Sequence, residues 1–250
     1  MPTTCLNCGA EMQHQFCPYC GQKKDVEKIN WHSFVHDIGH FFTHIEKGFL
    51  NTSLQLLIRP GRVIKEYLAG KRKKYHKPIS FYLIWAAIRL LTFTFVISLM
   101  DYENFRSSSG NAFFFSKEVG TYVVQHNQVF GLLLVPIISL FIWIILSRPK
   151  MNYIETLTAS IYASAIIEML IFSQILIVGL LLQTNFLTNW FVLQVQVVYT
   201  SWMFFCLIDI FKKNGIKLLA LKILLVLIIS FFVYQILALL IASFILGLKH

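Results

Sequence analysis

Five long apolar segments dominate the chain from residue 79 onward. They run from 79 to 100, 129 to 147, 154 to 182, 190 to 211 and 218 to 246. As an α-helix, each is long enough to cross the ~30 Å hydrocarbon core of a bilayer. The pattern predicts an all-α polytopic membrane protein in which residues 79–250 form a bundle of five transmembrane helices.

A different periodicity precedes the first span, between residues 29 and 58. Apolar residues spaced by three and four predict a helix with one apolar face. They are Trp31, Phe34, Val35, Ile38, Phe41, Phe42, Ile45 and Phe49. We expect this amphipathic helix to lie flat on the membrane or on the bundle.

A row of histidines follows the opposite face of this helix. His32, His36, His40 and His44 recur every four residues, so neighbours in the row are close in space. One interpretation is a solvated or headgroup-facing row turned to the cytoplasm. The other is a second metal site or a pH sensor built from His36, His40 and His44.

Residues 59–78 form a basic collar immediately before the first span, with eight Lys or Arg and one acid. Such a cluster favours the anionic cytoplasmic leaflet by roughly 1 kcal/mol per basic residue. Candidates for lipid headgroup or partner contact are Arg59, Arg62, Lys71, Arg72, Lys73 and Lys74. The alternative is a solvated basic loop that only sets the topology.

Composition agrees with a membrane protein. The chain is 56% hydrophobic and 14% charged, and its mean hydropathy is +0.64. The net charge of +10 lies mostly in the collar and in short loops, so a nucleic-acid partner is not expected. The loops at 148–150 and 212–217 are basic, whereas 101–128 holds three acids and two bases. This alternation predicts an inner-membrane protein with its N-terminus in the cytoplasm and its C-terminus outside.

The strongest local motif is Cys5-x2-Cys8-x8-Cys17-x2-Cys20, with a glycine after the second cysteine of each pair. Two such turns supply a tetrahedral four-sulfur site, typical of structural zinc. A disulfide pair is disfavoured in the cytoplasm, and an iron site is the other alternative. Residues 1–28 are therefore predicted to form a zinc-ribbon-like head, whose metal has no open position for a substrate.

Two ionisable residues lie deep in predicted spans. Arg89 is in the first span and Glu168 in the third, at similar depths. A charge there costs on the order of 3 kcal/mol, so each needs a partner, and they are the obvious partners for each other. The pair is either a structural clasp or a polar pocket. By contrast, Glu155, Asp209 and Lys222 lie near span ends and are expected at the interface.

Several motifs together resemble a bacterial membrane-protein family, domain of unknown function 3667. They are Cys17-Pro18-Tyr19-Cys20-Gly21-Gln22, the run from His40 to Phe49, Arg59-Pro60-Gly61, and Tyr67-Leu68-Ala69-Gly70-Lys71-Arg72 with Pro78. The resemblance covers roughly residues 5 to 85. It implies a zinc-ribbon-like head on a multi-span membrane domain and implies no activity.

No catalytic motif was found, so an enzyme is not favoured. The first functional hypothesis is a docking or regulatory protein, with a possible cytoplasmic protein partner at the zinc head. The second is a transporter or channel for an ion, lipid or small solute that uses Arg89 and Glu168. The third is a membrane enzyme acting on lipid, with the histidine helix supplying ligands or bases.

Overall fold

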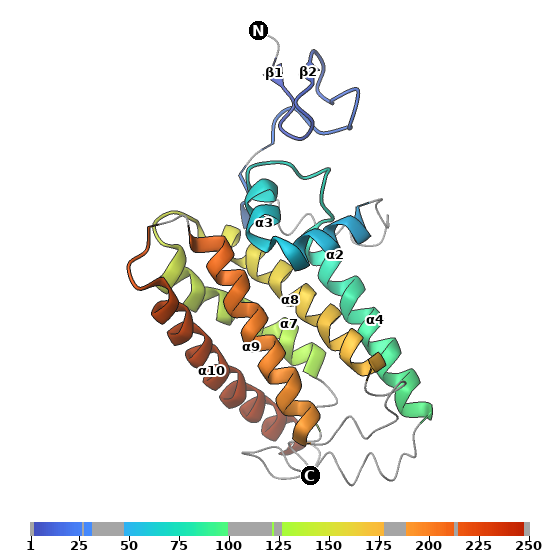
Figure 1. Ribbon diagram of the computed structural model, residues 1–250, viewed down its shortest axis with the longest axis vertical. Helices are drawn as coiled ribbons and strands as arrows, with labels where there is room; N and C mark the ends of the chain where they lie inside the picture. Colours follow the sequence, from blue (N-terminus) through green and yellow to red (C-terminus); the bar gives the residue numbers. More distant parts are fainter. Residues whose placement is uncertain are drawn as a thin grey trace.

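The computed structural model describes residues 3–26, 28–31, 48–99, 122, 127–177, 189–212 and 215–247. Within them, a small cysteine-containing head stands at one end of a helical bundle, and the described chain ends at the other (Figure 1).

Among the described residues, five helices are long and apolar enough to cross a membrane, which confirms the predicted all-α architecture. They are α4 (Pro78–Leu99), α7 (Asn127–Ile142) continued by the π-helix η1 (Trp143–Ser147), α8 (Tyr153–Ile175), α9 (Asn189–Phe211) and α10 (Leu219–Gly247). Their ends lie within two residues of the predicted ones, except that α8 is described as an α-helix only to Ile175.

Helix α8 is the centre of the bundle. Its span is 67% buried, against 33% or less for each of the others, and it packs most extensively against α4. Its start is fixed by a capping box, because Asn152 accepts from the N–H of Glu155 while the Glu155 carboxylate accepts from the N–H of Asn152. Glu155, which was expected at the membrane interface, therefore forms part of the N-terminal cap of α8.

Two short helices lie between the head and the spans (Figure 1). Helix α2 spans Phe49–Ile58 and α3 spans Pro60–Leu68. Pro60 suits the first turn of α3, where its missing N–H has no partner to lose. The basic collar is thus not a loop throughout: Val63, Ile64 and Tyr67 of α3 are buried against the bundle.

Helix α2 is the described end of the amphipathic helix predicted over residues 29–58. Within the predicted apolar face, Phe49 stacks on Trp85 at 5.3 Å between ring centroids, whereas Trp31 is exposed. His32, His36, His40 and His44 lie outside the described residues, so the structure does not test the histidine row.

The head is a compact pair of turns on a two-stranded sheet. Strands β1 (Thr3–Thr4) and β2 (Glu11–Met12) pair antiparallel, with Thr3 opposite Met12. Cys5, Met12 and Cys17 form its buried core.

The basic loops share one end of the bundle. The connections after η1 and after α9 lie at the same end as α2, α3 and the head (Figure 1). They contain Arg148, Lys150, Lys212 and Lys217. The helix order therefore places these residues and the collar on a single side of any membrane that the bundle crosses.

Candidate metal centre and buried ion pair

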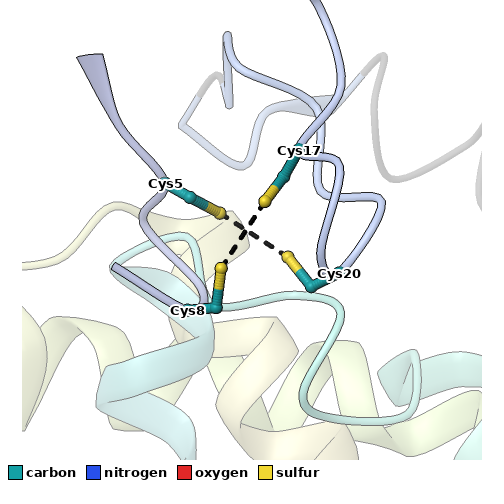
Figure 2. A group of neighbouring side chains, drawn as sticks. All are labelled: Cys5, Cys8, Cys17 and Cys20. Carbon is teal, nitrogen blue, oxygen red and sulfur yellow. Dashed lines mark hydrogen bonds between the residues drawn. The ribbon is translucent and has the colours of Figure 1, made fainter. Parts of the chain in front are cut away.

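Four cysteines converge in the head (Figure 2). The sulfur of Cys5 lies 3.6 Å from that of Cys20, and the sulfur of Cys8 lies 3.5 Å from that of Cys17. All four sulfurs fall within 4.8 Å of one another. Tetrahedral bonds of about 2.3 Å would separate sulfurs by roughly 3.8 Å, so the spacing fits a four-thiolate metal site.

The two halves of this site are built in the same way. In each, the N–H of a glycine donates to the carbonyl of the first cysteine four residues earlier, Gly9 to Cys5 and Gly21 to Cys17, both at 2.9 Å. Both glycines have left-handed φ values, 78° and 70°. This conformation is readily available to glycine, which explains its place after each Cys-x2-Cys turn.

The pKa shifts of the clustered cysteines favour binding of a cation. Burial raises the pKa of the Cys17 thiol, but N–H groups of Cys20 and Tyr19 outweigh this effect and bring the pKa to about 7. The N–H of Ala10 lowers the pKa of Cys8, yet the neighbouring sulfurs raise it to about 12. The site thus favours some thiolates and resists having all four unless a positive ion binds between them.

The cysteines are free thiols rather than disulfides, since a disulfide needs sulfurs about 2.05 Å apart. The donor set is soft, fourfold and tetrahedral in spacing. It can hold a metal ion such as zinc, and Cys5, Cys8, Cys17 and Cys20 would be its ligands.

Side chains of both cysteine turns accept hydrogen bonds from the collar. Asn7, between the first two cysteines, accepts from the N–H of Lys74 at 3.0 Å. Gln22, after the last cysteine, accepts from the N–H of Lys73 at 3.1 Å and is 4% exposed. Neither residue stood out in the sequence, although Gln22 lies in a recognised motif, because its partner is 51 residues away.

Glu66 organises the basic residues of the collar. Its carboxylate accepts from Lys74 at 2.7 Å and from the Tyr75 hydroxyl at 2.7 Å, and it pairs with Arg62 at 3.1 Å and Lys71 at 3.6 Å. Lys74 and Tyr75 hold the pKa of Glu66 at about 2. Three of the six candidate headgroup contacts, Arg62, Lys71 and Lys74, are therefore paired with an acid of the same segment.

The motif Arg59-Pro60-Gly61 joins the collar to the end of α9. The N–H of Gly61 donates to the Asp209 carboxylate at 2.8 Å. A Cβ on Gly61 would lie 2.4 Å from the Asp209 carbonyl oxygen, so only glycine permits this approach. Asp209, expected as an interface residue, thus binds the positive N-terminus of α3.

Arg89 of α4 and Glu168 of α8 form an ion pair between the two most closely packed helices. They are 6% and 7% exposed. Tyr82 and Tyr234 are electrostatic neighbours of both charges. The structure thus brings together the two residues that the sequence singled out by depth.

A small cavity lies between α7, α8 and α9, away from this pair. Its volume of about 10 Å³ is close to that of a single water site. Its lining is Ile142, Thr156, Ala159, Ser160, Ala163, Met203, Leu207, Ile210 and Phe211. Neither Arg89 nor Glu168 lines it.

Comparisons with known proteins cover only part of the chain. No curated protein and no solved structure matches it. Residues 46–97 match the family model described as Protein of unknown function (DUF3667), a stretch that contains α2, α3, the collar and most of α4. This match confirms the resemblance to that family over the collar and the first span.

Proposed function

We propose that the chain is a non-enzymatic docking or regulatory protein of the inner membrane, whose four-cysteine head binds a structural zinc ion in the cytoplasm. The observation that carries the proposal is the pair of hydrogen bonds from Lys73 and Lys74 to the head. They connect the metal site directly to the most basic segment of the chain.

Zinc suits this site for two reasons. Four thiolates satisfy its coordination without leaving a position for a substrate, so the ion stabilises the head rather than catalyses. A reducing cytoplasm also keeps the cysteines available as ligands.

The metal would control the collar through its two acceptors. Asn7 lies inside one cysteine turn and Gln22 lies two residues after the last cysteine of the other, so loss of the ion would displace both side-chain oxygens. The turn at Lys73 and Lys74 would then be released from the head. In this scheme the metal state sets how the collar presents its cations to a cytoplasmic protein or to anionic headgroups.

The experiment compares hydrogen exchange of residues 70–77 with and without metal, using the full chain in detergent. Metal content is first measured by elemental analysis, and we expect one zinc per chain. Removal with a chelator, or replacement of Cys17 and Cys20 by Ser, should speed exchange in the head and in residues 70–77. Helices α4 and α8 should keep their protection.

A second pair of variants separates metal binding from coupling. Asn7→Ala combined with Gln22→Ala should retain the zinc but speed exchange at residues 70–77, whereas Gln13→Ala, an exposed head residue, should change neither. A chain without bound metal, or a collar whose exchange ignores the metal, would contradict the proposal.

The carrier function is the second candidate, because the Arg89–Glu168 pair is buried inside the bundle, where a transport site would lie. The alternative for this pair is a structural clasp, in which each charge only neutralises the other. The lipid-enzyme hypothesis rests on the histidine row alone, which lies outside the described residues.

A further inference from the structure

Helix α2 has three distinct faces. Thr52, Ser53 and Leu56 are buried against the bundle, with exposures of 4% or less. Asn51 and Gln55 form a polar face and hydrogen-bond to each other, and Gln55 also accepts from the Tyr75 hydroxyl of the collar.

The third face is apolar and exposed. Leu50, Leu54 and Ile58 repeat every four residues, and they are 72%, 61% and 65% exposed. At about 100° per residue they fall within an arc of roughly 80°. This is a continuous stripe rather than scattered apolar residues, and such stripes mark an interaction surface.

The depth of α2 identifies what meets this stripe. Ser53 accepts from the indole N–H of Trp85 at 3.1 Å, and Phe49 packs on Phe81 and Trp85. These are residues within the first eight of α4, which begins at Pro78. Helix α2 therefore lies beside the beginning of a membrane span rather than above it.

The orientation of α2 relative to the spans also favours contact with the membrane. Figure 1 shows α2 lying across the spans, not along them. Its ten residues carry no charge, and exposed Arg59 follows directly at its end, where the side chain can reach the headgroups.

We propose that α2 is an in-plane membrane helix, whose Leu50, Leu54 and Ile58 stripe inserts into the acyl chains of the leaflet on the head side. The polar face then points to the collar and the buried face to the bundle. The bilayer is the occupant because the stripe belongs to an uncharged helix that lies across the spans, level with the beginning of one of them. This inference does not depend on zinc or on the role of the head.

The test is photocrosslinking at matched positions of the same helix. Benzoylphenylalanine replaces Leu54 in one variant and Gln55, which hydrogen-bonds to Tyr75 of the collar, in the other. Each full-length variant is placed in vesicles of phosphatidylethanolamine and phosphatidylglycerol, illuminated and analysed by mass spectrometry. Position 54 should give several-fold more lipid adduct than position 55.

A probe at Leu50 repeats the measurement if the variant at position 54 does not fold. Equal lipid adducts at the stripe and at position 55 would overturn the proposal. So would crosslinks from the stripe to a second copy of the chain, seen as a product of twice the mass, because the stripe would then be a dimer interface.

Discussion

Arg89 and Glu168 are buried charges, which destabilise the fold when unpaired and are stable within the bundle when each has the other as its counterion. Replacing either by Leu leaves the other charge buried without its partner, which should lower the free energy of unfolding by about 3 kcal/mol. The double replacement leaves no charge and should be less damaging than either single change. Thermal unfolding in detergent measures the three variants.

Lys222→Leu provides the control for that series, because Lys222 is exposed near the start of α10. Its effect should be small. Additive losses in the double variant would contradict the clasp and favour a role for each charge separately.

Residues could be predicted where one position carries its own signal. Cysteine spacing revealed the cluster of four cysteines, and depth within an apolar segment revealed Arg89 and Glu168. Asp209 was expected only near a span end, and its bond to Gly61 could not be predicted. The two residues lie 148 positions apart, and nothing local shows that two helix ends meet. Gln22 and Asn7 were missed for the same reason, since their acceptor role exists only once the head meets the collar.

At the scale of elements, the collar depends on one acid. Glu66 has a pKa of about 2, below its ordinary value of 4.5, chiefly because Lys74 and Tyr75 bind its carboxylate. Folding therefore favours the ionised form. This stabilisation is present above pH 4.5 and is lost as the pH falls toward 2.

Glu66→Gln should test this pH dependence. The variant should unfold at a lower temperature than the unaltered chain at pH 7, and the gap should narrow between about pH 4.5 and pH 2. Taking the difference between the two chains removes the contribution of the cysteine site, because any metal bound there would be lost in acid from both chains alike. A gap that stays constant with pH would show that the carboxylate charge does not stabilise the collar.

Long apolar helices could be predicted from the sequence more easily than short, partly charged ones. The five spans could be located because an apolar segment of about 20 residues has few other structures open to it. Helix α3 was hidden in the collar, because its nine residues include Pro60, Gly61 and three charges. Its buried face becomes apparent only against α9.

The positions of the basic loops predict an orientation for the whole molecule. The collar, Arg148, Lys150, Lys212 and Lys217 share the head end of the bundle, and basic loops tend to stay in the cytoplasm. We therefore expect the head in the cytoplasm and, after five spans, the end of α10 outside.

This orientation can be tested with fusion proteins. Alkaline phosphatase, which is active only outside, should report activity when fused after residue 247, and green fluorescent protein should fluoresce at the N-terminus. A fusion at position 151, between the second and third spans, is the internal control and should also fluoresce. The reverse pattern would place the cysteine head in an oxidising compartment, where disulfides become the expected state of its thiols and the zinc proposal falls with the orientation.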